Sequence, residues 1–390
     1  MTRQSSEIYP TPILGRMTMG VIQDTRRAVR LDSLTGLRFY AAILVVLTHV
    51  THEFSGPVVS ALFKQGGVGV SFFFVLSGFV LTWSRKDGQR KRDFYRNRFA
   101  RVYPLHLITW GLTLVLLAVT ASAASLPVAL VCLILVQAWV PNSSYYFGVN
   151  GPSWSLSDEA FFYAVFPFLA PLLVKARTAT LVKAAIGLYA LVAVVTLGGS
   201  LFLTNLPVGD IFYSNPLYRL WEFVLGIVLA VALKNGWRAP IGLRTVAGLS
   251  VVAFAGVTAL NIGLTNKFGP LAGVPVHSFP PYFASLVMTP CFVLLIAAAA
   301  RSDIEGRATH LGSRAMVSLG YWSFALYISH LLLVDMLKLL IPSDLPWFAS
   351  WPVVIGVVAG AVGLSALLYT FVEMPLEAKL RAPRAGVRLD

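Results

Sequence analysis

Long apolar segments alternate with short basic runs along almost the whole chain after residue 30. A helix that crosses a bilayer needs about 20 predominantly apolar residues, and eleven segments approach that length. They lie at 33–53, 67–83, 102–121, 126–140, 159–174, 181–203, 216–233, 242–263, 281–300, 316–340 and 351–372. The pattern therefore predicts an all-α integral membrane protein.

The basic runs indicate which segments cross, because Lys and Arg collect in cytoplasmic loops. An even number of crossings must separate one cytoplasmic run from the next. Two segments fill every interval except 102–174, which contains three. The basic runs are the N-terminal tail, 85–101, 175–183, 234–244, 301–314 and 379–388.

Segment 126–140 is short, and we predict that it does not cross but forms a re-entrant or interfacial helix. The stretch 141–157 that follows is polar and has no Lys or Arg, so we expect it outside the cytoplasm. The prediction is thus about ten transmembrane helices with both termini cytoplasmic. The expected organisation is a disordered basic tail at 1–30, a membrane domain at 31–375 and a basic cytoplasmic tail at 376–390.

Composition excludes a soluble protein. Of the 390 residues, 57% are hydrophobic and only 12% charged, whereas soluble domains carry roughly 25% charged residues. The net charge of +14 would suggest nucleic acid in a soluble protein, but here it orients the chain in the lipid bilayer, so no nucleic-acid partner is expected. Cys132 and Cys291 lie in apolar segments without metal-ligand spacing, and no metal site is predicted.

Arg38 and His49 are the clearest candidates for chemistry, because ionisable residues inside a membrane span are costly and mark functional sites. Eleven residues separate them, which returns to nearly the same helix face about 16 Å further along the axis. A snorkelling arginine and a packed histidine would be the structural alternative.

Arg98 and Arg101 share a face at the cytoplasmic entrance of the third span, at i, i+3. This spacing allows two guanidinium groups to grip a phosphate, although topogenic charge also explains much of the run. We expect binding of a phosphate or another acidic ligand here.

The run from Trp154 to Glu159 opens another apolar segment. Ser155 and Asp158 fit a capping box, but Glu159 is left unexplained by capping. We place Glu159 toward the outer side with His49, where a carboxylate and a histidine would form a general-base pair. Glu53, at i+4 from His49, is a second candidate for orienting the imidazole.

Weaker signals lie in two other spans. Tyr327 and His330 in segment 316–340 can add hydrogen bonds to a cavity, and Arg219 with Glu222 at i, i+3 is predicted to form an internal ion pair.

Together these motifs resemble the acyltransferase-3 family of polytopic membrane acyltransferases, which O-acylate bacterial surface sugars and some macrolide antibiotics. The resemblance covers about Leu31 to Pro375. It rests on five motifs in order: Arg38 with His49, Gly69–Phe79, Arg98–Pro104, Trp154–Glu159 and Tyr327–His330.

The resemblance implies transfer of an acyl group, such as acetyl, from cytoplasmic acyl-CoA (acetyl-CoA) to a hydroxyl of a sugar, cell-envelope glycan or macrolide-type product. The acceptor would be a small molecule or a glycan, and the location a bacterial cell membrane. On this basis the expected site has three groups of residues. They are His49 and Glu159 for catalysis, Arg38, Arg98 and Arg101 for the CoA phosphates, and Trp154, Ser155, Tyr327 and His330 for the substrate.

Two other function classes stay open from the residues alone. A secondary transporter of a sugar or antibiotic would also bury charges, and an inward Arg and His can serve a proton relay. A membrane scaffold is the third possibility, but it leaves the intramembrane histidine unexplained.

Overall fold

The structure is a computed structural model that describes residues 30–86, 88–203, 205–267, 280–342 and 347–382. Within these ranges the chain is built from helices and contains no strand. The first half consists of α2 (Asp32–Phe54), α3 (Pro57–Phe63), α4 (Gly69–Trp83), α5 (Lys91–Val119), α6 (Leu126–Leu133), α7 (Ser143–Tyr146), α8 (Trp154–Val174) and α9 (Thr178–Phe202). The second half consists of α10 (Val208–Ser214), α11 (Pro216–Lys234), α12 (Leu243–Lys267), α13 (Pro281–Ile304), α14 (Arg314–Lys338), α15 (Trp347–Leu368), a π-helical segment (Tyr369–Glu373) and α16 (Met374–Leu380).

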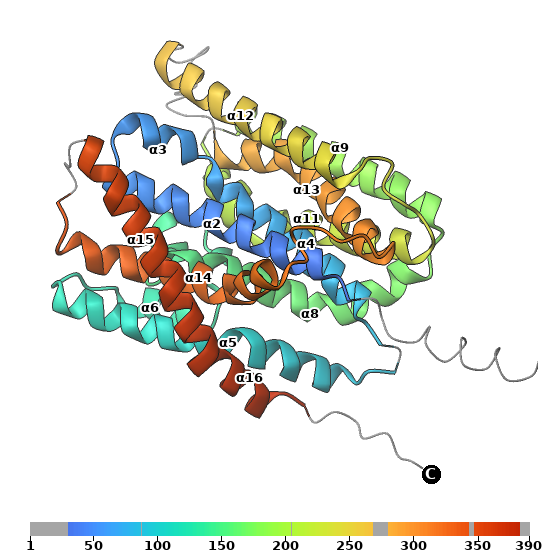
Figure 1. The fold of residues 1–390 in the computed structure, drawn as a ribbon, viewed down its shortest axis with the longest axis horizontal. Coiled ribbons are helices and arrows are strands. Elements are labelled where there is room, and N and C mark those ends of the chain that lie inside the picture. Colours follow the sequence, from blue (N-terminus) through green and yellow to red (C-terminus); the bar gives the residue numbers. More distant parts are fainter. Residues whose placement is uncertain (1–29, 87, 204, 268–279, 343–346, 383–390) are drawn as a thin grey trace, which may run out of the picture. The chain divides into compact units, whose positions relative to one another are not determined.

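Ten helical stretches of the described chain are long and apolar enough to cross a bilayer. This confirms the predicted all-α membrane protein with about ten spans. The helices form a bundle (Figure 1) in which α4 and α11 are the most buried and α9 and α12 are largely exposed. Large apolar side chains such as Leu191, Val194 and Val251 are exposed on these two helices, as expected for surfaces that meet hydrocarbon and not water.

The segment predicted not to cross is a short helix. α6 has eight residues, which at 1.5 Å per residue is far less than the roughly 30 Å of a bilayer core. It ends at Leu133, and two residues later Leu135 has a positive φ of 59°, which a helix cannot continue through. Trp110 of α5 donates to the carbonyl of Ala129 at 3.1 Å, and the His106 ring lies 3.0 Å from the Cys132 carbonyl. These two contacts hold α6 against α5.

Two close crossings join the central helices. At Gly226 of α11 a Cβ would overlap the Val75 carbonyl of α4, and at Gly320 of α14 it would overlap the Thr35 carbonyl of α2. Small residues at such points allow two helix backbones to approach closely. The crossings fix α4 against α11 and α2 against α14, and three of these four helices line the site described below.

The predicted tails lie mostly beyond the described residues. Positions 1–29 and 383–390 are outside them, so the expected disorder at 1–30 is not addressed by the structure. At the other end, α16 continues as a helix to Leu380, past the expected domain boundary at 375.

The crossing of α11 and α4 can be tested by adding a side chain to it. Gly226→Leu should destabilise the folded protein by about 1–3 kcal/mol or more, because the new side chain must displace the α4 backbone. Thermal unfolding of the detergent-solubilised protein, followed by size-exclusion chromatography, measures the effect. Gly256→Leu is the matched control, since a Cβ at Gly256 on α12 meets no atom within 4 Å. Equal melting of both variants would contradict the close crossing.

Candidate active site

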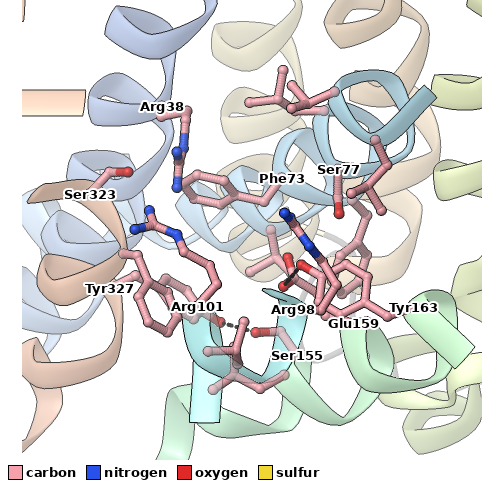
Figure 2. A pocket seen from close by; sticks show the side chains of 18 residues that line it. Arg38, Phe73, Ser77, Arg98, Arg101, Ser155, Glu159, Tyr163, Ser323 and Tyr327 are labelled. Atoms are coloured by element: carbon pink, nitrogen blue, oxygen red, sulfur yellow. Dashed lines mark hydrogen bonds between the residues drawn. The ribbon is translucent and has the colours of Figure 1, made fainter. Parts of the chain in front are cut away.

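A polar pocket lies between α2, α4, α5, α8 and α14, in the middle of otherwise apolar helices. Its polar lining residues are Arg38, Ser77, Arg98, Arg101, Ser155, Glu159, Tyr163, Ser323 and Tyr327. Figure 2 shows these side chains converging from separate helices, with Arg38 and Arg101 turned toward one another. The pocket therefore brings together residues from the first span and from the ninth.

The volume of the pocket limits what it can enclose. It is about 140 Å³, below the roughly 300–1,000 Å³ of pockets that surround a whole drug-sized ligand. It therefore has room for a small chemical group but not for a large ligand. A larger molecule would have to extend out of the pocket.

Among the pocket side chains that form no ion pair, positive charge exceeds negative charge. In the described part of the chain, no ion pair joins Arg38 or Arg98 to a carboxylate, and the buried Arg98 Nε has no hydrogen-bond partner. Glu159 accepts a 2.6 Å hydrogen bond from Tyr163, one turn further along α8. Figure 2 shows Arg98 beside Glu159. Two guanidinium groups against one carboxylate leave a net charge of about +1, which favours an anionic ligand.

Arg101 is held more firmly than the other two arginines. Its Nη1 pairs with Glu373 of the π-helical segment and, at 2.9 Å, with Glu377 of α16. Its guanidinium also lies over the Phe324 ring, 5.8 Å from the centroid. Arg101 thus lines the pocket and links it to the C-terminal helix, and the two glutamates balance its charge.

A second hydrogen-bonded group forms the inner wall of the pocket. The Ser155 and Tyr327 hydroxyls lie 2.8 Å apart, and Tyr327 also donates to the Pro152 carbonyl at 3.0 Å. Trp154, predicted with them to bind the substrate, instead packs into the aromatic core against Phe74 and Tyr213. Ser155 and Tyr327 therefore face the pocket, and Trp154 supports it from behind.

His49 does not contact Glu159, as the sequence suggested, but His330. The His330 Nε2 lies 3.2 Å from the His49 Nδ1, which is also 2.9 Å from the Val45 carbonyl. His330 is almost fully buried, whereas His49 is partly exposed. The pair lies one helical turn beyond Tyr327, so Tyr327 connects it to the pocket.

The partners of the two imidazoles fix their proton positions. His330 Nδ1 lies 2.7 Å from the Tyr327 carbonyl, which can only accept, so in the neutral ring this nitrogen carries the proton. His330 Nε2 is then an acceptor for the proton on His49 Nδ1. This leaves the Nε2 of His49 unprotonated and without a partner among the described residues. A free imidazole nitrogen of this kind can accept a proton or attack a carbonyl carbon.

The predicted position of Glu159 on the outer side, beside His49, is wrong, and the loop before α8 gives the reason. The end of this loop, residues 149–153, is mostly buried in the bundle, whereas residues 141–144 are exposed. The Asn150 amide donates to the Ile328 carbonyl at 2.9 Å, and the Gln137 amide donates to the Ser153 carbonyl at 3.0 Å. Helix α8 consequently begins inside the bundle, and Glu159 reaches the depth of Arg38 and Arg98.

Glu53, the second candidate for orienting His49, also has another partner. Lys338 of α14 forms an ion pair with it at 2.9 Å. The predicted internal ion pair between Arg219 and Glu222 is confirmed, at 3.1 Å. Asp158 is fully buried but does not line the pocket, and neither of its carboxylate oxygens has a hydrogen-bond partner in the described structure.

Several residues of the site were not predicted from the sequence. Tyr163 could have been found, because i, i+4 spacing from Glu159 places both on one helix face. Glu373 and Glu377 carry no such local signal, since their partner Arg101 is 272 and 276 residues away. Ser77 and Ser323 are ordinary small residues of their helices, and only packing brings them to the pocket.

Comparison with known proteins identifies the family. Residues 31–370 match the acyltransferase-3 family, described as an acyltransferase domain. The chain is 35% identical over 376 residues to the acyltransferase MdmB of Streptomyces mycarofaciens, covering 90% of this chain and 92% of that protein. No solved structure matches the chain.

Two more distant relatives are larger proteins. The peptidoglycan O-acetyltransferase OatA of Listeria monocytogenes is 23% identical over 374 residues, which are 88% of this chain and 55% of that protein. The O-acetyltransferase OatA of Staphylococcus aureus is 23% identical over 379 residues, 90% and 57% respectively. The chain thus spans about half the length of these two relatives.

These matches do not support the secondary-transporter alternative, because the matched family and the relatives named above are acyltransferases. With its helical membrane bundle and its match over residues 31–370, the chain belongs to the acyltransferase-3 family of polytopic membrane acyltransferases.

Proposed function

We propose that the protein transfers an acyl group, acetyl in the simplest case, from acyl-CoA to a hydroxyl of a sugar, cell-envelope glycan or macrolide-type product. One observation carries the proposal. Helix α2 supplies an arginine to a polar pocket and, about three turns further on, a histidine whose orientation is fixed by His330. A membrane helix has no structural need for either group.

The donor end of the site is the arginine pocket. Arg38 and Arg98 would bind phosphate groups of the donor, and the remaining N–H groups of Arg101 would complete this surface. The axial separation of about 16 Å between Arg38 and His49 is comparable with the length of a pantetheine arm. The thioester would then reach the inner wall while the nucleotide stays at the basic entrance.

His49 would act as the general base. Its Nε2 accepts the proton of the acceptor hydroxyl as the oxygen attacks the thioester carbonyl carbon and the carbon–oxygen bond forms. The carbon–sulfur bond then breaks, and the departing thiolate takes the proton from the imidazolium. In the two-step alternative, His49 Nε2 attacks the thioester carbonyl carbon, the carbon–sulfur bond breaks and the thiolate leaves. The acceptor oxygen then attacks the acyl-imidazole, the carbon–nitrogen bond breaks, and the hydroxyl proton passes to the thiolate.

The other polar groups would position the reactants. His330 holds the proton of His49 on Nδ1, and Ser155 and Tyr327 offer hydroxyl groups to the acceptor or to the developing oxyanion. Glu159, held by Tyr163, would set the electrostatics of the arginine pocket rather than orient His49. This is a different role from the general-base partner expected from the sequence.

Replacing the base tests the catalytic assignment. His49→Ala should lower kcat by about a hundred- to ten-thousandfold with normal membrane insertion, because the group that takes the hydroxyl proton is removed. Transfer of label from acetyl-CoA to a cell-envelope or macrolide acceptor by the purified protein measures it. His52→Ala, at an exposed position one turn on, is the control and should stay active. His330→Ala should retain partial activity, since it removes only the group that orients His49. A fully active His49→Ala protein would refute the assignment.

Replacing one pocket arginine tests the donor site. Arg98→Gln should raise the KM for the acyl donor roughly tenfold or more and change kcat less, because a charged hydrogen bond to phosphate is lost. Arg96→Gln is the matched control, since Arg96 is exposed and donates to the Leu380 carbonyl instead of facing the pocket. Unchanged KM in Arg98→Gln, or an equal rise in the control, would mean that the arginines only set topology. Absence of any turnover of acyl-CoA would point to another donor.

The proposed orientation, with the arginine entrance in the cytoplasm, can be tested by thiol labelling. In a Cys132→Ala, Cys291→Ala background, Ser144→Cys should react with an impermeant maleimide on intact cells, because Ser144 is exposed in the part of this loop that we expect outside the cytoplasm. Gln89→Cys, in the exposed basic loop, should react only after the cells are opened. The reverse pattern would overturn the orientation.

A further inference from the structure

A second, larger cavity lies on another side of α2. It has a volume of about 1030 Å³ and is bounded by α2, α4, α12, α13 and the loop 307–311. Most of its lining is apolar, including Leu44, Phe72, Phe254, Met288 and Phe292. This volume is several times that of the arginine pocket and lies at the upper end of the roughly 300–1,000 Å³ of pockets that enclose whole ligands.

The two cavities occupy different faces of α2. Leu37, Ala41 and Leu44 form an i, i+4, i+7 stripe that faces the large cavity. Arg38 and His49 lie about 100° and 120° around the helix from Leu37. The large cavity is therefore a separate feature, not an extension of the candidate active site.

The length of the cavity matches one leaflet of a bilayer. Its lining on α2 runs from Leu37 to Leu47, about 15 Å at 1.5 Å per residue. This is half of the roughly 30 Å hydrocarbon core. An extended hydrocarbon chain of a single leaflet would fit along it, with its polar end beside Leu37.

The polar end of the cavity is basic. Arg244, Arg307 and His310 line it there, together with the hydroxyl-bearing residues Thr245 and Thr309. Arg244 and His310 are exposed, and within the described chain neither side chain forms an ion pair or a hydrogen bond. The end opposite the apolar lining thus offers unpaired positive charge.

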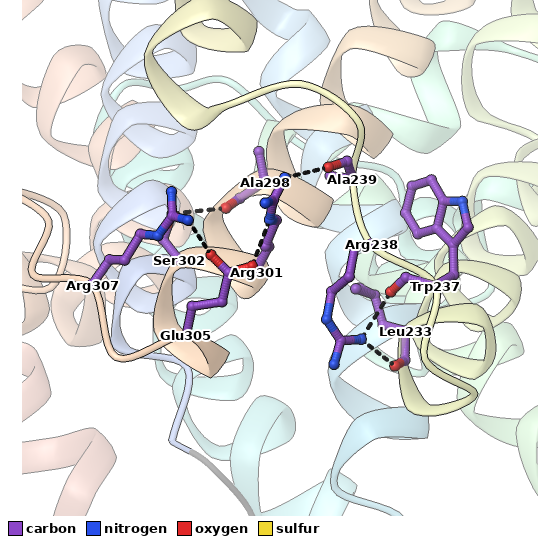
Figure 3. Close-up of polar contacts among 9 residues, drawn as sticks. All are labelled: Leu233, Trp237, Arg238, Ala239, Ala298, Arg301, Ser302, Glu305 and Arg307. Carbon is purple, nitrogen blue, oxygen red and sulfur yellow. Dashed lines mark hydrogen bonds and ion pairs between the residues drawn. The ribbon is translucent and has the colours of Figure 1, made fainter.

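Neighbouring contacts build this basic end into the fold. Arg301 of α13 donates to the Ala239 carbonyl at 2.7 Å, which ties the loop before α12 to α13 (Figure 3). Glu305 pairs with Arg301 and Arg307, at 2.7 Å each. The hydrogen bond from Arg301 lowers the pKa of Glu305, so this carboxylate offsets one cation. With Arg244, the three arginines outnumber Glu305 by two charges.

We propose that this cavity binds an anionic phospholipid, with an acyl chain along α2 and α12 and the phosphate at Arg244, Arg307 and His310. Charge complementarity selects the headgroup, and the leaflet-length apolar lining selects a lipid over a free phosphate. With the orientation proposed above, the basic end lies in the cytoplasmic leaflet, where anionic lipids attract basic residues. The lipid fills the space between α2 and α12.

Lipid retention by the purified full-length protein tests the proposal. The protein is exchanged into vesicles of phosphatidylcholine with a minor fraction of phosphatidylglycerol, extracted, and examined by native mass spectrometry. The double variant Arg244→Gln, Arg307→Gln should retain roughly thirtyfold less phosphatidylglycerol. Each basic residue near an anionic headgroup contributes about 1 kcal/mol of binding free energy, and the loss of two such contributions corresponds to roughly this change in affinity. Ala247→Trp, which fills the cavity wall, should exclude both lipids from it.

The matched control is the double variant Lys175→Gln, Arg177→Gln. It removes two exposed cations that do not line the cavity, and it should retain phosphatidylglycerol as the parent protein does. Both double variants change exposed positions, so their monodispersity in size-exclusion chromatography separates lipid loss from misfolding. The proposal would be overturned if the parent protein retained the two lipids equally or if the control lost as much phosphatidylglycerol as the Arg244, Arg307 variant. Displacement of the bound phosphatidylglycerol by inorganic phosphate would also overturn it.

Discussion

The cost of placing a guanidinium group among apolar helices constrains the whole bundle. Arg38 lies within the first spanning helix, and an arginine at the centre of such a helix costs about 2.5–3.5 kcal/mol by insertion scales. The cost is tolerable because four other helices turn polar side chains toward it and form a small polar pocket. The same arrangement leaves Arg38 and Arg98 unpaired by carboxylates within the described chain, which makes the pocket attractive to an anion.

The C-terminal helix completes this arrangement from the far end of the chain. The π-helical segment directs Glu373 to Arg101, and α16 adds Glu377 in the next turn. Figure 1 shows α16 beside α5. A π-helical turn shifts the side chains that follow it relative to a regular helix, and such turns occur often at functional sites. Arg101 thereby becomes a fixed wall, while Arg38 and Arg98 stay free for a ligand.

Close backbone contact explains how the histidine pair forms. Gly320 lets α14 approach α2 at Thr35, and the two helices then bring His330 to His49. One imidazole is buried with both nitrogens engaged, and the other presents a free nitrogen. The large basic-ended cavity lies against a different face of the same helix. Helix α2 thus separates a polar site from an apolar one, because successive residues of a helix point to different faces.

The sequence by itself determined the class of structure and most of the polar groups of the site. Apolar segment length and charge placement gave the helical membrane bundle and the non-crossing segment 126–140, because lipid imposes these constraints locally on each segment. The same reasoning singled out Arg38, His49, Arg98 and Glu159, because a charge in an apolar run stands out without any knowledge of its partners.

Only the tertiary structure decided which of these groups meet. His49 contacts His330 across 281 residues, and Arg101 contacts Glu373 across 272. Glu159 joins the arginines because the end of the loop before α8 is buried, although its composition is that of an exposed loop. The depth of a side chain in the bundle, and the residues that it contacts, depend on how the helices cross and where the loops pack. The spacing of residues along the chain does not contain that information.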